Sequence, residues 1–91
     1  GLGVAESNLG MALLQANRLG EAEAQFRAAL DSFAAAGYAR SVHAITTLGN
    51  LANVESLLGR LADADRHYRE AAALASAATA EIATMAALLQ N

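Results

Sequence analysis

Small and apolar side chains recur near the start of the chain at the spacing of a helix. One helical face, at positions i, i+3, i+4 and i+7, is formed by Leu9, Ala12, Leu13 and Ala16. Similar patterns return along the rest of the chain, and no alternation typical of a strand competes with them. The sequence therefore predicts an all-α protein, with helices at residues 2–17, 21–36, 39–58, 62–77 and 80–91.

The predicted helices have recognisable ends. Asn17, Gly37 and Gly59 are expected to close helices, because asparagine and glycine tolerate the left-handed conformation found there. Acidic residues such as Glu21 and Asp63 follow, where the positive end of the next helix favours them. The second helix is expected to bury one face, formed by Ala22, Phe26, Ala29 and Leu30.

The chain repeats itself at a distance of forty-two residues. The stretch NRLGEAEAQFRAAL (17–30) matches GRLADADRHYREAA (59–72) at this distance, and MAALLQN (85–91) matches AITTLGN (44–50) at a distance of forty-one. A single helical hairpin cannot bury its apolar face, whereas stacked hairpins can. The sequence predicts one segment of repeats, at 2–37, 38–79 and, in part, 80–91. We expect this segment to belong to a longer protein.

The repeated positions resemble the tetratricopeptide repeat. The family pattern is matched by Leu9-Gly10, Leu13, Ala22, Phe26 and Ala29, and again by Leu51-Ala52, Ala64, Tyr68 and Ala71. Small residues in this pattern let paired helices touch, and one aromatic residue per unit fills the remaining gap, so Phe26 and Tyr68 are both expected in the core. The resemblance implies a right-handed α-solenoid of about two and a half stacked antiparallel hairpins.

Two departures from the family pattern indicate a subclass. The early tryptophan of the family is replaced by Glu6 and Leu48, and the period exceeds the usual thirty-four residues. A forty-two-residue period with the stretches NLG (8–10) and GNLAN (49–53) resembles the longer repeats of kinesin light chains and of large bacterial signalling regulators.

Composition argues against several classes of partner. The net charge is −3, and six arginines without lysine form no basic stripe for a nucleic acid. The stretch LASAATAEIATMAALL contains Glu81 and is mostly alanine and threonine, so we expect no membrane span. His67 follows Asp63 by one turn, but two ligands are too few for zinc. No cofactor is expected, and a cytoplasmic location fits the absence of cysteine and of a signal peptide.

Candidate binding residues lie on the first helix of each unit, which would line the concave side of the solenoid. Asn8, Asn50 and Asn91 occupy the same repeat position, and Asn53 lies one turn beyond Asn50. Their amides could pair with an extended peptide backbone, as the resemblance implies, or could cap and bridge helices. Residues expected to tune the choice of peptide are Arg40, His43, Thr46 and Leu57.

Arg40, His43, Thr47 and Asn50 are expected to share one face of the third helix. For His43, a role as a solvated polar residue is the alternative to peptide contact.

The sequence predicts a protein-interaction scaffold that binds a peptide segment or a partner domain. The alternative is an architectural spacer or sensor segment of a multidomain bacterial regulator, with any enzymatic activity elsewhere. No nucleophile, paired carboxylates or phosphate loop indicates an enzyme. Self-association is also expected through apolar terminal faces, which include Leu9, Leu13, Ile82, Leu88 and Leu89.

Overall fold

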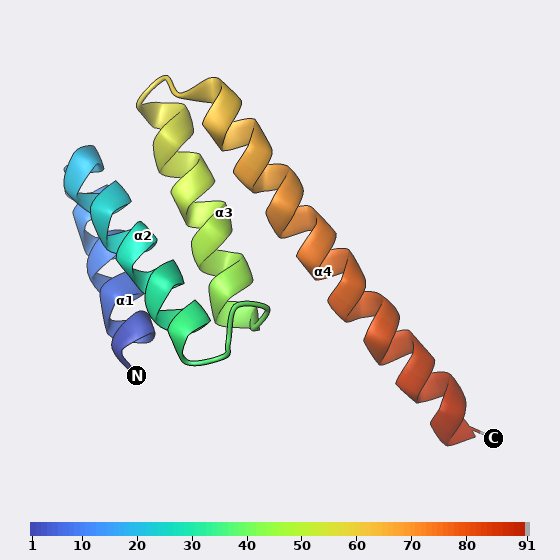
Figure 1. Cartoon of the computed structure of the whole chain (residues 1–91). Coiled ribbons are helices and arrows are strands. Elements are labelled where there is room, and N and C mark those ends of the chain that lie inside the picture. The colour runs from blue at the N-terminus through green and yellow to red at the C-terminus, as the bar shows by residue number, and fades with distance from the viewer. Residues whose placement is uncertain (91) are drawn as a thin grey trace.

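The chain folds into four helices that pack side by side as antiparallel neighbours (Figure 1). The computed structural model describes residues 1–90. The helices are α1 (Leu2–Gln15), α2 (Leu19–Ala35), α3 (Val42–Leu57) and α4 (Leu61–Gln90). Each helix packs against the next, and α1 also contacts α3. Residues 1–90 contain no strand, which confirms the predicted all-α architecture of stacked hairpins.

Left-handed residues close the first three helices, as the sequence predicted. Asn17, Gly37 and Gly59 have φ angles of 61°, 84° and 83°. Each closure has the same pair of backbone hydrogen bonds: in α3, for example, the N–H of Arg60 donates to the carbonyl of Glu55 at 2.8 Å, and Gly59 donates to Ser56 at 3.0 Å. This pairing satisfies carbonyls that a helix end would otherwise leave free.

The third helix begins later than predicted. Residue 39 was the expected start, but α3 begins at Val42 because the hydroxyl of Ser41 caps it, accepting a hydrogen bond of 3.1 Å from the N–H of Ala44. Arg40 therefore lies in the loop between α2 and α3, not on a helix. Its predicted place on the long third helix was wrong.

Two glycines of α1 lie directly against aromatic rings of α2. A Cβ atom added to Gly10 would come within 2.7 Å of Phe26, and one added to Gly3 within 2.8 Å of Phe33. The two glycines are seven residues apart, as are the two rings, so both contacts recur after two helical turns. The sequence indicated the contact at Gly10 and missed the one at Gly3.

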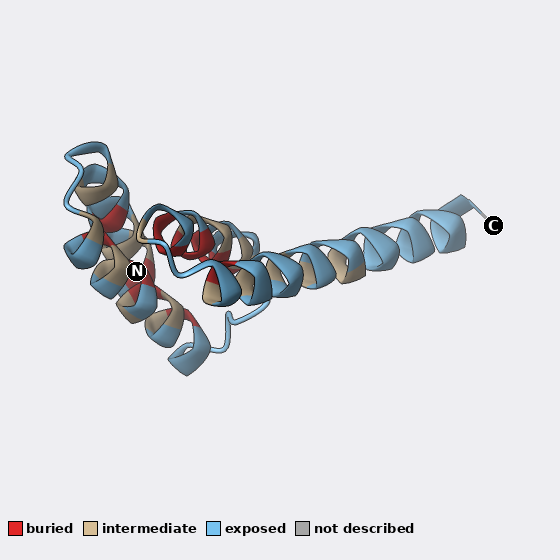
Figure 2. Ribbon diagram, turned by 90° about the horizontal axis from the view of Figure 1, so that it is seen from above, coloured by how far each residue is buried: buried red, intermediate tan, exposed pale blue. Residues whose placement is uncertain are grey.

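The core lies between the second and third helices (Figure 2). Its main cluster consists of Ala22, Phe26, Leu51 and Val54, and a second cluster of Ala29, Phe33 and Ala44. Phe26 is fully buried, as expected, but the prediction that Tyr68 is core was wrong: 45% of Tyr68 is exposed. Phe26 packs against the α3 residues of its cluster. Among the described helices, α4 packs only against α3, and no helix covers its outer side.

The fourth helix is continuous from Leu61 to Gln90, so the predicted break at 78–79 was wrong. No glycine or proline follows Gly59, and the position that matches Gly37 is Thr79. The hydroxyl of Thr79 instead donates to the carbonyl of Ala75 at 3.0 Å, within the helix. The end of α4 extends beyond the other helices (Figure 1) and leaves four large apolar side chains exposed: Ile82, Met85, Leu88 and Leu89.

By length and composition alone, α4 could cross a membrane, and none of its most apolar window is buried within the chain. The sequence pointed the other way, because the same stretch contains Glu81 and little apolar bulk. Core helices and signal sequences meet the same criterion, so this finding does not by itself place α4 in a membrane. The absence of a membrane partner stays a prediction.

The protruding end of α4 should open more readily than its packed part. Backbone amides within 80–90 are expected to exchange with deuterium faster than those within 64–74, because only the latter lie on the part of α4 that packs against α3. Hydrogen exchange followed by mass spectrometry of peptides from both halves measures the difference. Equal protection along α4 would show that residues 80–90 have a packing partner.

Candidate functional site

Five of the predicted binding residues form one continuous face of α3. His43, Thr46, Asn50, Asn53 and Leu57 follow at alternating spacings of three and four, and we call this set the α3 stripe. Asn50 is half-buried and the other four are exposed. Side chains on the opposite face, such as Leu48 and Ala52, are buried. The stripe is therefore the polar side of α3 that remains open to a partner.

The first helix brings a further asparagine into the same region. Asn8 is exposed on α1. The hydroxyl groups of Ser7 and Thr47 lie 2.9 Å apart and join α1 to α3, one residue before Asn8 and one turn before Asn50. Thr47 is only 1% exposed, so the face of α3 that it shares with His43 and Asn50 is closed at this position.

The asparagine side chains are not used to bridge helices. Among the side-chain hydrogen bonds of residues 1–90, none involves the amide of Asn8, Asn50 or Asn53. Asn91 lies outside the described residues. The three described amides therefore keep their donors and acceptors available, which argues against the bridging alternative.

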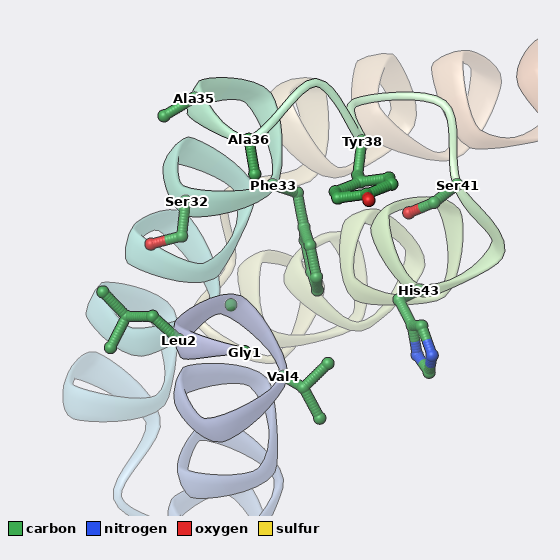
Figure 3. A pocket seen from close by; sticks show the side chains of 11 residues that line it. Gly1, Leu2, Val4, Ser32, Phe33, Ala35, Ala36, Tyr38, Ser41 and His43 are labelled. Atoms are coloured by element: carbon green, nitrogen blue, oxygen red, sulfur yellow. The ribbon is translucent and has the colours of Figure 1, made fainter.

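One end of the stripe opens into an apolar hollow (Figure 3). This hollow has a volume of about 570 Å³ and lies between the start of α1, the end of α2 and the start of α3. His43 belongs both to its wall and to the α3 stripe, and its ring stacks on Phe33 with the ring centres 6.3 Å apart. Apolar side chains from three segments complete the wall, including Leu2, Val4, Phe33 and Tyr38. A hollow of this kind suits an apolar side chain of a ligand.

The sequence missed this hollow because its walls come from separate segments. Tyr38 is exposed in the loop after Gly37, and no periodic pattern relates it to Val4 or Phe33. Arg40 lies in the same loop and contacts Glu81 of α4 at 3.7 Å. It is exposed beside the start of α3 rather than in line with the stripe.

Behind the stripe, a buried carboxylate connects three helices. Glu55 of α3 is fully buried, and its Oε1 lies 2.5 Å from Nδ1 of His67 on α4. Its Oε2 accepts a hydrogen bond of 3.2 Å from Arg27 of α2. Arg27 also lies 3.5 Å from Glu23, which accepts a short hydrogen bond from Arg60. The hydrogen bond from Arg60 to Glu23 raises the pKa of Arg60, so this arginine stays charged.

This network links α2, α3 and α4 through ion pairs and hydrogen bonds. Sequence reasoning related His67 to Asp63, one turn away on the same helix, and did not find Glu55, which lies twelve residues before it. The only signal was a single carboxylate within 51–58, a stretch that has no other charged residue. Residues 1–90 contain no group of three or more side chains that could hold a metal ion.

The chain combines stacked antiparallel hairpins, close contacts at small residues and one open polar face on α3. This combination defines a helical-repeat protein. A model of the tetratricopeptide repeat matches residues 2–77, most of the chain. The chain therefore belongs to the tetratricopeptide repeat family. Repeats of this family generally mediate protein–protein interactions and are typically non-enzymatic scaffolds. No curated protein and no solved structure matches this chain.

Proposed function

We propose that this chain binds an extended peptide segment of a partner protein along the α3 stripe and Asn8. The observation that carries the proposal is the open polar face of α3, on which Asn50 and Asn53 have no protein partner among the described residues. An amide side chain can donate to a peptide carbonyl and accept from a peptide N–H at once. Backbone pairing of this kind supplies affinity with little preference for sequence.

The apolar hollow would supply the preference. His43 joins the stripe to the hollow, so a peptide lying on the stripe could place an apolar side chain between Val4, Phe33 and Tyr38. Thr46 and Leu57 would contact side chains further along the peptide. Arg40, which lies beside the start of α3, would favour an acidic residue near that end.

The long repeat period supports an assignment to the subclass that resembles kinesin light chains and bacterial signalling regulators, and a cytoplasmic location is part of this proposal. A second candidate is an architectural segment within a multidomain regulator. It is favoured by the apolar side chains left open on the two outer helices: Leu9 is 49% exposed on α1, and Leu61 is 66% exposed on α4. Self-association through these faces stays a prediction.

The groove is tested by replacing one amide. Peptides are first selected on the full chain from a display library of random sequences. Asn50→Ala is expected to weaken their binding several-fold, because one or two net hydrogen bonds of about 0.5–1.5 kcal/mol each are lost. The melting temperature should hardly change, since the amide makes no side-chain hydrogen bond within residues 1–90. Isothermal titration calorimetry and thermal unfolding followed by circular dichroism measure both quantities.

Gln90→Ala is the matched control, because it also removes a side-chain amide from a helix, but at an exposed position far along α4. Its binding should be unchanged. If Asn50→Ala lowers the melting temperature and leaves the affinity intact, the asparagine is structural. A selection that gives no binding peptides would instead favour the architectural role.

A further inference from the structure

The outer face of α4 is the repeat equivalent of a face that is covered in the first unit. We use the name "α4 outer face" for Leu61, Asp65, Tyr68, Arg69 and Ala72, which lie forty-two residues after Leu19, Glu23, Phe26, Arg27 and Leu30. The α2 residues pack under or beside α3, and Phe26 is fully buried. All five α4 residues are exposed. The contact between α2 and α3 is therefore an internal template for what could cover α4.

The template contains a specific ionic arrangement. Glu23 and Arg27 of α2 form a pair one helical turn apart, and α3 adds a carboxylate to it. This carboxylate, Glu55, is fully buried against Arg27 at 3.2 Å. Five residues further on, Arg60 donates to Glu23, which is left with only 12% of its side chain exposed. The covering helix thus supplies a glutamate for the arginine, and the turn that follows this helix supplies an arginine for the glutamate.

The same pair is present on α4 without these partners. Arg69 donates to Asp65 at 2.9 Å, and the two side chains are 81% and 62% exposed. No other charged group within residues 1–90 makes an ion pair with either of them. Tyr68 lies between them in sequence and, at 45% exposure, presents a partly open ring where the template has the buried Phe26.

We propose that the α4 outer face docks an amphipathic helix of a partner protein, and that this helix presents a carboxylate to Arg69. Small and branched apolar side chains on this partner helix would cover Tyr68 and Leu61, as Leu51 and Val54 cover Phe26 in the template. A basic residue five positions after the carboxylate, just beyond the end of the partner helix, would meet Asp65. This surface is separate from the α3 stripe, so the chain could hold a peptide and a docked helix together.

A second copy of the chain is a poorer occupant. In a head-to-tail stack its α1 would cover α4, and Arg18 would match Arg60 of the template. The position that matches Glu55, however, is Leu13, which is itself partly buried against the core cluster. Arg69 would then face an apolar side chain and lose water without gaining a carboxylate, which is unfavourable. Charge complementarity therefore selects an acidic helix over self-stacking.

The test uses a synthetic helix copied from this protein. Its sequence is that of residues 41–61, with a hydrocarbon staple across Thr46 and Asn53, both exposed in α3, to keep it helical. The full chain, labelled with ¹⁵N, is titrated with this helix while amide shifts are recorded. We expect the shifts to concentrate at Asp65, Tyr68 and Arg69.

Removing either charge should weaken binding about threefold to tenfold, because a neutral hydrogen bond replaces a charge-assisted one that is about twice as strong. The two changes are Glu55→Gln in the synthetic helix and Arg69→Gln in the chain. The Arg69→Gln chain should no longer distinguish the glutamate helix from the glutamine helix. Arg66→Gln, which removes an arginine exposed to 65% on the same helix, is the matched control and should bind like the unchanged chain.

Three results would overturn the proposal. The first is that the amide shifts are confined to α1 or to the α2–α3 interface. Another is an affinity that does not depend on Glu55 and Arg69. The third is a chain that forms oligomers in sedimentation experiments through α1 and α4 and excludes the synthetic helix, which would identify a second copy as the occupant. Because no stripe residue is altered in the chain, a failure here is distinguishable from a failure of peptide binding at Asn50.

Discussion

Replacing glycine by alanine is expected to have opposite effects at Gly10 and Gly49. Both residues lie within helices, where alanine is favoured over glycine by about 0.5–1 kcal/mol. The added methyl group meets nothing within 4 Å at Gly49. At Gly10 it would lie 2.7 Å from Phe26, a ring that is fully buried and has no open space to move into.

Gly10→Ala should therefore lower the free energy of unfolding by about 1–3 kcal/mol, the usual cost of overpacking a core, and Gly10→Leu by more. Gly49→Ala should raise it by about 0.5–1 kcal/mol. Urea unfolding followed by circular dichroism measures both changes on the same chain. A stabilising Gly10→Ala would mean that α1 and α2 are further apart than in this structure.

The second large effect is expected at the buried carboxylate. Glu55→Ala should lower the free energy of unfolding by about 2–3 kcal/mol, because it leaves His67 without its partner and opens a cavity between three helices. Complete loss of a partner from a buried pair costs about 3–5 kcal/mol. The expected loss is smaller because half of the Arg27 side chain is exposed and this arginine keeps Glu23 as a neighbour.

Glu81→Ala is the control for this substitution. Glu81 also pairs with an arginine, Arg40, but both side chains are largely exposed, so the change should stay within about 0.5 kcal/mol. Unfolding of both variants in urea gives the comparison. Equal effects of the two substitutions would show that Glu55 is reached by water and does not act as a buried link between the helices.

The helices and most of their ends could be predicted because they depend on local chemistry. Left-handed closure at Asn17, Gly37 and Gly59 needs only the residue at that position and the turn before it. The repeat also indicated which small residue lies under the aromatic ring, as Gly10 does under Phe26. The start of α3 was missed because the hydroxyl of Ser41 competes as a cap with the helical propensity of the preceding residues.

The candidate site was predictable in part for the same reason. Residues on one helix, such as His43, Thr46 and Asn50, share a face by spacing alone. The hollow beside His43 could not be predicted, since its wall joins the start of α1 to the loop after α2. The burial of Thr47 could not be predicted either, because its contact with Ser7 of α1 depends on how two helices cross.

The sequence by itself determined the repeating unit: which segments are helical, where three of them close and which faces carry small, apolar or amide side chains. These properties follow from interactions between residues within a few turns of one another. The tertiary structure decided which equivalent residues differ in burial. Phe26 is covered and Tyr68 is open, and Glu55 is buried while Leu13 takes its place in α1. Burial depends on the helix that lies opposite, and a repeat pattern does not state whether that neighbour is present.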